Sequence, residues 1–570
     1  PVIPDDNYGS YEFVGWDPEV TPAYSNINYY AQYRVNGKHH IKLDPFPGFV
    51  SEDEYYVKSG DPVPFLDAVR PGYKFLGWFY NERQILAGPL PTFTESEPYI
   101  YAKWEENHVE EEGMYRYQLN SDRMSYSIGK GDSFDAVTSS IKTVTLPDTY
   151  NGKPITGICE YGFSSCYEVE EIILPESIMM IGMYGFNHSS ISSIRITKNV
   201  EFIGFVAFNG TTNLSIIEVD PLNPYLYGVN NANVIIRKKD FTLLVGCKGS
   251  TIPNGVVTIG ENAFAYENLE HSITLPNTLA KIEGNAFIGA NINGELVLPD
   301  SVREIEAFAF QQNKIESLHI DANINYIGVG AFAMNPYLES ITCSPNSYYY
   351  AERNTLVCSS TRTVIAGCKN SYLPVTIDAI ESYAFAGSLI TNMHVPACVM
   401  RIGVEAFKDC HELVSVDIPY TVNSIDYGPF INCEKLATII VDPLNTTFTS
   451  GNNGNAIVRD GVVIAGCNNT DLTKFNHVSS IDFAAFEGSG ITSIVLPEGM
   501  EQIGDYAFNQ CHNLKNVSFP SSLRLIGTAA FQSCEQLEKI ILPEGITSLA
   551  PFAFSCCRSA TEIYLPNSLT

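Results

Sequence analysis

The cysteines are the residues of this chain with the widest choice of chemistry, because thiols can bind zinc, form disulfides or attack electrophiles. The chain has 14 of them. No pair has the Cys-x-x-Cys spacing of a zinc clamp, and Cys556 and Cys557 are directly adjacent. A small buried thiol otherwise packs like a compact hydrophobic group. We therefore expect nearly all cysteines to be free, buried thiols, with no metal bound.

Other reactive patterns are weak. The sequence contains no His-Glu-x-x-His, no Gly-x-Ser-x-Gly and no phosphate-binding loop. Ser489 lies between two glycines in a turn, and the acidic residues are spread without a paired catalytic spacing. Asn452, Asn453, Asn455 and Asp460 do not follow the EF-hand spacing and suit a hairpin turn instead. We predict no catalytic residue, no metal ligand and no cofactor, and therefore no enzyme.

Composition narrows the classes of partner. The chain has 570 residues, and its 64 acidic and 34 basic residues give a net charge of −30. Such a field repels nucleic acid and anionic lipid, so neither is an expected partner. No apolar run reaches the roughly 18 residues that cross a bilayer. An aromatic content of 12% argues against disorder.

A phenylalanine that follows a small residue recurs along most of the chain and marks an internal repeat. Consecutive anchors are 22 or 23 residues apart, except at three gaps of 53 to 56 residues. The anchors are Phe163, Phe186, Phe208, Phe264, Phe287, Phe310, Phe332, Phe385, Phe407, Phe430, Phe486, Phe508, Phe531 and Phe554. A period of this length indicates stacked structural repeats.

Residues 526–543 illustrate one unit. Residues 537–542 alternate and are rich in branched side chains, which predicts a short strand that Pro543 ends. The first half of the unit predicts a compact turn with Phe531 facing inward. Because one unit is too small for its own core, stacking must bury these side chains, and the expected fold is a mainly β solenoid with short turns or 3₁₀ segments.

Strand alternation places one central side chain of each unit outward. This outward row varies, while its inward neighbours are nearly all Ile, Leu or Val. A varied row is free to suit a partner, although it could equally be an ordinary solvated sheet face. The outward row comprises Ile173, Arg195, Glu218, Thr274, Val297, His319, Thr342, His394, Asp417, Ile440, Val495, Ser518, Ile541 and Tyr564. We take Arg195, Glu218, His319, His394, Asp417 and Tyr564 as its most informative candidates for binding.

The three long gaps share a second pattern, which runs from Asp-Pro-Leu-Asn or Ser-Pro-Asn to a Gly-Cys pair. We expect each gap to hold a β-hairpin followed by one extra strand. Aromatic residues gather there, and exposed Tyr348 and Tyr349 are candidate contacts for a protein or a glycan. The same rings could simply cover the hairpin. Tyr225, Tyr227, Tyr350 and Phe448 belong to the same set of aromatic residues in the gaps.

Units of the form Ile-Gly-x-x-Ala-Phe-x-x-Cys-x-x-Leu-x-x-Ile-x-Leu-Pro resemble the BspA-like leucine-rich repeats of surface proteins. Cysteine follows the anchor by three positions in six units, at Cys166, Cys410, Cys433, Cys511, Cys534 and Cys557. The resemblance covers residues 115–570, of which 115–150 are expected to form an N-terminal cap. It implies a non-enzymatic bacterial protein, secreted or held at the cell surface, that adheres to host or extracellular-matrix proteins. A structural stalk and a glycan-binding module are the alternatives.

Residues 1–104 carry a different pattern. Residues 72–78, Gly-Tyr-Lys-Phe-Leu-Gly-Trp, precede residues 101–104, Tyr-Ala-Lys-Trp, and residues 11–16 and 30–33 repeat this in part. Both resemble the Listeria–Bacteroides repeat of internalin-type proteins, a small β-grasp module. We expect the C-terminal part of one module at 1–33, a complete one at 34–104 and an acidic linker at 105–114. The chain is expected to be a fragment of a longer protein, with its signal and anchor elsewhere.

Overall fold

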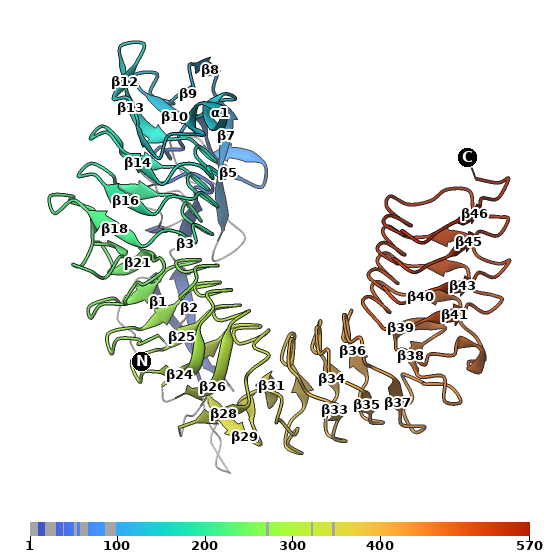
Figure 1. Ribbon diagram of the computed structural model, residues 1–570. Helices are drawn as coiled ribbons and strands as arrows, with labels where there is room; N and C mark the ends of the chain where they lie inside the picture. Colours follow the sequence, from blue (N-terminus) through green and yellow to red (C-terminus); the bar gives the residue numbers. More distant parts are fainter. Residues whose placement is uncertain are drawn as a thin grey trace, which may run out of the picture. The chain divides into compact units, whose positions relative to one another are not determined.

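The computed structural model describes residues 9–17, 30–37, 39–50, 54–57, 66–85, 98–269, 273–320, 323–344 and 348–569. The chain divides into two compact units, Pro1–Tyr227 and Gly228–Thr570, and each is described by itself. Nearly every described element is a strand, and the chain winds in successive coils (Figure 1). The predicted mainly β solenoid of 22- and 23-residue units is confirmed. We name each coil by its anchor phenylalanine.

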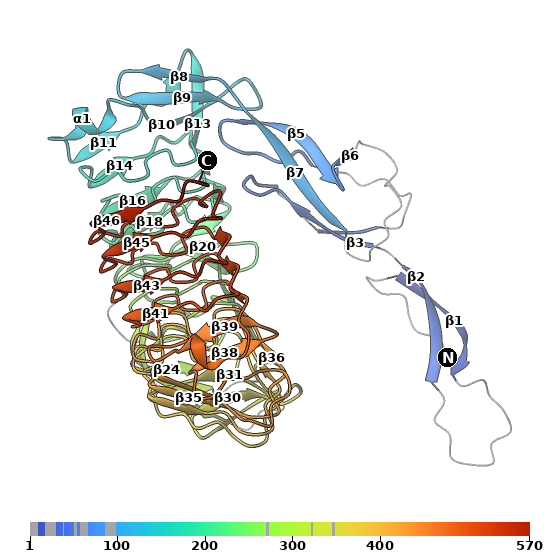
Figure 2. The ribbon, with the colours of Figure 1, turned by 90° about the vertical axis from the view of Figure 1, so that its right-hand side faces the viewer.

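The first unit begins with two small sheets, which Figure 2 shows. β1 (Gly9–Asp17) pairs antiparallel with β2 (Tyr30–Gly37). A five-stranded sheet follows in the order β4-β3-β7-β5-β6. Its strands are β3 (His39–Asp44), β4 (Glu54–Val57), β5 (Tyr73–Tyr80), β6 (Arg83–Ile85) and β7 (Tyr99–Glu106). Trp78 is 3% exposed in its core, and the indole N–H donates to the Leu66 carbonyl at 3.0 Å. The assignment of this sheet to a β-grasp module remains a prediction, as do the domain boundaries.

The segment expected to be a linker contains a strand. β8 (Val109–Glu112) pairs antiparallel with β9 (Tyr115–Leu119), which pairs in turn with β10 (Tyr126–Lys130). β10 then pairs in parallel with β13 (Lys153–Ile158), so these strands continue into a sheet of the solenoid. A short helix, α1 (Phe134–Thr138), and a strand, β12 (Thr149–Tyr150), complete this end.

Most coils contribute one strand to each of two sets of parallel sheets. We call the longer ones face strands and the two-residue ones short strands. In the first unit the face strands are β11 (Thr143–Thr145), β14 (Glu171–Ile173), β16 (Ser193–Ile196) and β18 (Ile216–Val219). The short strands are β15 (Met180–Ile181) and β17 (Phe202–Ile203), and β19 (Leu226–Tyr227) ends the unit.

The second unit repeats this arrangement. Its face strands are β24 (Asn293–Leu298), β26 (Lys314–Ile320), β28 (Ser340–Cys343), β33 (Asn392–His394), β35 (Ser415–Ile418), β37 (Thr438–Val441), β41 (Ser493–Val495), β43 (Asn516–Ser518), β45 (Lys539–Ile541) and β46 (Glu562–Tyr564). Its short strands are β22 (Thr258–Ile259), β23 (Lys281–Ile282), β25 (Glu304–Ile305), β27 (Tyr326–Ile327), β32 (Ala379–Ile380), β34 (Arg401–Ile402), β36 (Ser424–Ile425), β40 (Ser480–Ile481), β42 (Gln502–Ile503) and β44 (Leu525–Ile526).

The long gaps hold hairpins, as expected, and the second gap holds a further strand as well. In the first gap β20 (Ile235–Arg237) pairs antiparallel with β21 (Thr242–Val245), which itself pairs in parallel with β22. In the second gap β29 (Tyr349–Glu352), β30 (Thr355–Cys358) and β31 (Thr363–Gly367) form a meander, and β31 pairs in parallel with β32. The third gap repeats the single hairpin with β38 (Ala456–Arg459) and β39 (Val462–Gly466), and the 3₁₀ turn η1 (Leu472–Lys474) follows. In the second gap β31 is the further strand that was expected after the hairpin, and in the other two gaps the outgoing hairpin arm pairs directly with the next short strand.

The anchor phenylalanines form ring ladders through the core. Thirteen of the fourteen are buried, and Phe554 is partly buried. The rings of Phe264 and Phe287 stack with centroids 4.9 Å apart, and those of Phe287 and Phe310 with centroids 5.1 Å apart. Each inner ring thus has an aromatic neighbour above and below, which a single coil could not supply.

Backbone bonds reinforce the ladder. From the Phe287 coil, the N–H of Phe287 donates to the Ala309 carbonyl and that of Gly289 to the Gln311 carbonyl, both at 2.8 Å. Most of these backbone hydrogen bonds between coils require a residue with a positive, left-handed φ angle. These residues lie two positions before and two positions after the anchor. Asn285 (φ 54°) and Gly289 (φ 61°) take these places around Phe287. Asn and Gly tolerate this region best, since other side chains meet the backbone there.

In several coils, the residue three positions after the anchor donates a hydrogen bond to the anchor carbonyl of the preceding coil. The thiol of Cys511 donates to the Phe486 carbonyl at 3.0 Å, and the thiol of Cys534 to the Phe508 carbonyl at 3.2 Å. The side-chain amide of Asn313 likewise donates to the Phe287 carbonyl at 2.8 Å. Burial raises the pKa of Cys511 to about 12, so the thiol keeps its proton and remains a donor. These cysteines therefore hold neighbouring coils together, and all fourteen are free thiols in the structure.

Glycine explains how each hairpin joins the next coil. A Cβ atom built on Gly246 would lie 1.9 Å from the Phe264 ring, and one on Gly466 would lie 1.9 Å from the Phe486 ring. The outgoing hairpin arm therefore passes directly over the first anchor of the next block of coils. This close approach accounts for the glycine of the recurring Gly-Cys pair, since any larger residue would displace the ring.

Within the first unit, the five-stranded sheet packs against the first coils. The Phe49 ring stacks on the Phe202 ring with centroids 5.0 Å apart. Arg70 forms an ion pair with Glu160, and both side chains are mostly buried. The sheet and the coils of this unit therefore share apolar and charged contacts.

Truncating one anchor tests the ladder. Phe287→Ala removes a fully buried ring that stacks on two others, and such truncations cost about 3–5 kcal/mol. We expect the melting temperature, followed by circular dichroism, to fall by several degrees. His319→Ala on the strand face should change it little. Equal falls in the two variants would contradict the buried-ladder account.

Candidate binding surfaces of the solenoid

Parallel register aligns the outward row across successive coils. Arg195 on β16 lies opposite Glu218 on β18, and His394 on β33 lies opposite Asp417 on β35. The β-strands that carry them succeed one another along each unit (Figure 1). Adjacent inward residues such as Ile194 and Val416 are buried, so the alternation that the sequence predicts is confirmed.

The charged candidates in the outward row are accessible, and two of them, His394 and Asp417, pair with each other. Arg195 donates to Asp220 at 2.8 Å, and Nδ1 of His394 lies 3.3 Å from an Asp417 carboxylate oxygen. The His394 side chain is 82% exposed. Exposed pairs of this kind contribute little to stability, so their groups remain available to a partner at small cost.

The other candidates lie on the same row. Nδ1 of His319 is 2.7 Å from Thr342 Oγ1 in the next coil, and Glu218 is exposed. Tyr564 lies opposite Ile541 on the adjacent strand, and both are more than half exposed. Large apolar side chains also stand on this row, at Ile173, Val297, Ile440, Val495 and Ile541. A face that mixes apolar and charged side chains has the character of a protein-binding surface.

The aromatic residues of the insertions differ from expectation. Tyr348 is 51% exposed and remains a candidate contact. Tyr349 is only 5% exposed, and its hydroxyl accepts the Ile327 N–H at 2.9 Å. Phe448 is 2% exposed. Tyr349 and Phe448 belong to the packing of the hairpins, so the prediction that Tyr349 is a contact residue is wrong.

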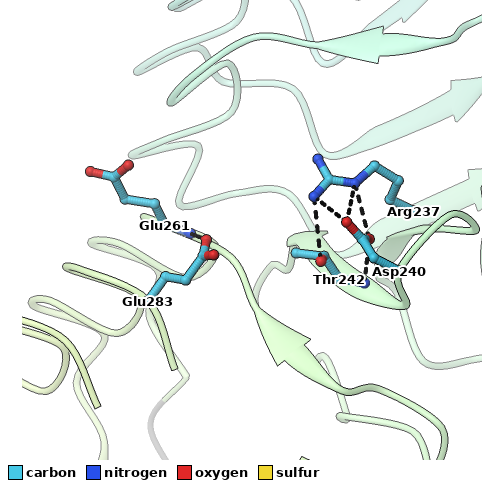
Figure 3. Close-up of polar contacts among 5 residues, drawn as sticks. All are labelled: Arg237, Asp240, Thr242, Glu261 and Glu283. Carbon is cyan, nitrogen blue, oxygen red and sulfur yellow. Dashed lines mark hydrogen bonds and ion pairs between the residues drawn. The ribbon is translucent and has the colours of Figure 1, made fainter. Parts of the chain in front are cut away.

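A polar group lies where the first hairpin meets the following coils (Figure 3). Arg237 binds the Asp240 carboxylate through two nitrogen atoms, with distances of 2.7 to 3.0 Å, and also approaches Thr242. Burial alone would raise the pKa of Asp240, but the hydrogen bonds from Arg237 and Thr242 outweigh it and lower the pKa. This arrangement closes the hairpin turn and leaves Asp240 ionised.

Beside it, carboxylates bridge successive coils. A Glu283 oxygen accepts the Glu261 N–H, and a Glu306 oxygen accepts the Gly284 N–H, both at 3.0 Å. Burial raises the pKa of Glu283, although the Glu261 N–H and Lys281 oppose the shift. Burial, and then the charge of Glu283, raise the pKa of Glu261. Because the Glu283 and Glu306 carboxylates each accept a backbone N–H from the preceding coil, these side chains serve to join coils.

Neither a metal site nor a membrane span is found among the described residues. Within those ranges, no three His, Cys, Asp or Glu side chains gather as they would around a metal ion. No helix in the described parts of the chain has the length and apolar character needed to cross a bilayer.

One surface escaped the sequence analysis. Aromatic residues two or three positions before the anchor project from the turns of the second unit, and we call them the turn-face strip. Tyr427 and Phe483 meet edge to face at 5.7 Å, and Phe483 and Tyr506 also lie 5.7 Å apart. The strip comprises Phe308, Tyr383, Tyr427, Phe483 and Tyr506. Their recurrence two or three positions before the anchor was the signal that could have revealed them.

The fold and these surfaces define a leucine-rich repeat solenoid without an evident reaction centre in its described parts. The model of the BspA-type leucine-rich repeat region matches residues 128–226, 257–377, 363–453 and 463–570, in six copies. The chain belongs to the BspA-type leucine-rich repeat family.

Solved structures that match the chain include two leucine-rich repeat proteins. A leucine-rich cell surface protein from Faecalibacterium prausnitzii is 20% identical, with 82% of this chain and 90% of that chain covered and a TM-score of 0.31. A leucine-rich repeat protein from Eubacterium ventriosum is 17% identical, with coverage of 80% and 96% and a TM-score of 0.37. A curated relative from Evansella cellulosilytica is 38% identical over 96 residues, which are 16% of this chain and 14% of that protein.

The carboxylates between coils predict a pH dependence. Because the pKa of Glu283 is raised in the folded state, the unfolded chain releases this proton first. Stability should therefore fall as pH rises from the ordinary carboxyl pKa through the raised value. Glu283→Gln keeps an acceptor for the Glu261 N–H, so we expect its melting temperature at pH 7 to exceed that of the wild type by about 1 °C. The difference should vanish near pH 4.

The matched control is Glu295→Gln, which changes an exposed carboxylate and should leave the profile unchanged. A Glu283→Gln protein that melts lower than the wild type at pH 7 would show that the ionised carboxylate stabilises the fold instead.

Proposed function

We propose that the chain is a non-enzymatic bacterial protein, secreted or held at the cell surface, whose solenoid binds a protein partner such as a host or extracellular-matrix protein. The single observation that carries the proposal is the outward row. Its side chains are accessible, varied and aligned in parallel register, while the inward residues beside them are buried in most coils.

The outward row is preorganised for binding. Because its strands are fixed by neighbouring coils, few side chains and no backbone must be ordered when a partner docks, and the entropic cost of association is reduced. Several modest contacts along such a row can add to a useful affinity. Apolar members such as Ile440 supply area to bury, and charged neighbours such as Asp417 supply direction.

Charge restricts the partner. With a net charge of −30, the chain favours basic or mixed surfaces and repels acidic ones. Association should consequently slow as salt is added, since screening weakens the attraction between exposed charges. The surface location is proposed from the family to which the repeats belong.

Substitution on three successive coils tests the proposal. His394, Asp417 and Ile440 lie side by side on β33, β35 and β37. The variant His394→Ala/Asp417→Ala/Ile440→Ser removes their side chains without touching the buried rows. Against a panel of purified extracellular-matrix proteins, measured by biolayer interferometry, we expect any bound protein to lose affinity about tenfold.

The control is Glu412→Ala/Lys435→Ala, which removes an exposed ion pair of 2.7 Å elsewhere on the same coils and should leave affinity nearly unchanged. If the triple variant binds like the wild type while removal of residues 1–104 abolishes binding, the N-terminal sheets carry the function. If the triple variant binds like the wild type and a glycan array is bound through Tyr348, the chain is a glycan-binding module. Binding of no protein or glycan by the wild type would favour a structural stalk.

A further inference from the structure

The turns of the second unit place aromatic rings in the left-handed backbone region, with Tyr506 exposed and Phe308 and Tyr383 partly exposed. Phe308, Tyr383 and Tyr506 have φ values of 58°, 60° and 57°. The equivalent position is glycine in other coils, at Gly330 and Gly428. A bulky side chain in the left-handed region costs free energy that glycine avoids. The fold uses the left-handed conformation at this position in every coil but does not require an aromatic side chain there, so the choice of a bulky ring points to function.

Burial does not compensate this strain. Tyr506 is 37% exposed, and its neighbours Phe483 and Tyr427 are 39% and 51% exposed. The three rings touch one another across successive coils, with Tyr427 edge-on to Phe483 at 87°. At the other end, Phe308 meets Tyr383 at 5.4 Å. The strip therefore presents ring faces and edges to solvent along several coils.

Carboxylates outnumber ammonium groups beside the strip. Glu405 occupies the turn position between the coils of Tyr383 and Tyr427, and it pairs with Lys408 at 2.6 Å. Glu405 and Lys408 both act electrostatically on Tyr383. Glu487 and Asp409 lie near the same lysine, which contributes to the electrostatics of Glu487. One ammonium thus faces three carboxylates.

Aromatic faces combined with excess negative charge recognise cations. The ring quadrupole attracts a guanidinium or ammonium group, arginine most often, and the carboxylates can pair with the same group. An anionic segment would be repelled by Glu405, Asp409 and Glu487. The chemistry therefore selects a basic polypeptide.

We propose that the turn-face strip binds an arginine- and lysine-rich segment of a partner protein, with guanidinium groups over the rings of Tyr427, Phe483 and Tyr506 and against the neighbouring carboxylates. This surface is separate from the outward strand row, because its residues belong to the turns of the coils. The chain therefore has a second binding surface, which could engage the same partner or another.

The test uses the full chain and a fluorescein-labelled peptide of alternating arginine and glycine, followed by fluorescence anisotropy. The strip variant is Phe483→Ala/Tyr506→Asn, and asparagine suits the left-handed position that Tyr506 occupies. We expect the dissociation constant to rise about tenfold in this variant. Tyr506→Asn alone should melt no lower than the wild type, because it relieves backbone strain.

Two controls distinguish peptide binding by the turn-face strip from attraction to the net negative charge of the chain. Tyr337→Ala/Tyr372→Ala removes two exposed tyrosines outside the strip and should leave the dissociation constant unchanged. A peptide in which citrulline replaces arginine, and so lacks the positive charge, should bind at least about tenfold more weakly. The triple variant of the outward row should bind the arginine peptide like the wild type, so this test does not depend on the first proposal.

Three outcomes would overturn the proposal. Equal affinity of the strip variant and the wild type would show that the peptide is held by net charge alone. Equal binding of the citrulline peptide would show that the rings take a neutral ligand. No binding of the arginine peptide by the wild type would show that the strip does not recognise cations.

Discussion

Contact between neighbouring coils is the interaction on which the rest of this structure depends. A unit of 22 or 23 residues cannot enclose its own phenylalanine, so each ring is buried by the rings of the coils on either side. The two parallel sheets and the bonds between turns run in the same direction as this stacking. Stability in such a molecule is therefore a sum of contacts between neighbours.

Several features of the sequence follow from that constraint. In several coils the buried carbonyl of the anchor accepts a hydrogen bond from a cysteine or asparagine three residues after the next anchor. The hairpins must end on glycine because their outgoing arm lies against a ring. Since these requirements are met inside the solenoid, the outward strand positions and the exposed turn positions are left free to vary, and both proposed binding surfaces lie there.

The sequence was sufficient to predict the features that recur in every unit. It was insufficient to predict the features that occur in only one place. The spacing of the anchors predicted the solenoid, the buried rings and the outward placement of Arg195, His394 and Tyr564, because a period fixes which side chains face inward. Tyr349 has no counterpart in a regular repeat, and its burial depends on how one hairpin folds over Ile327. The strand β8 was expected to be linker because its glutamates suit solvent, yet one edge of a sheet can carry such residues.

The turn-face strip was missed for a different reason. Tyr506 and Tyr383 occupy a position where glycine or asparagine is favoured, and the left-handed backbone there cannot be recognised from an aromatic residue alone. Only the structure shows that the rings are both strained and exposed. A sequence comparison between coils, taken two residues before each anchor, would have identified the position but not its conformation.

Amide hydrogen exchange of Phe287→Ala, followed by mass spectrometry, tests the nearest-neighbour account most directly. If each coil depends on the coils beside it, protection should fall in residues 264–311, where the rings of Phe264 and Phe310 lose their partner. Protection in residues 486–531, which are several coils away, should remain close to that of the wild type. Equal loss of protection in both segments would show that the solenoid unfolds as one cooperative body and would contradict the account.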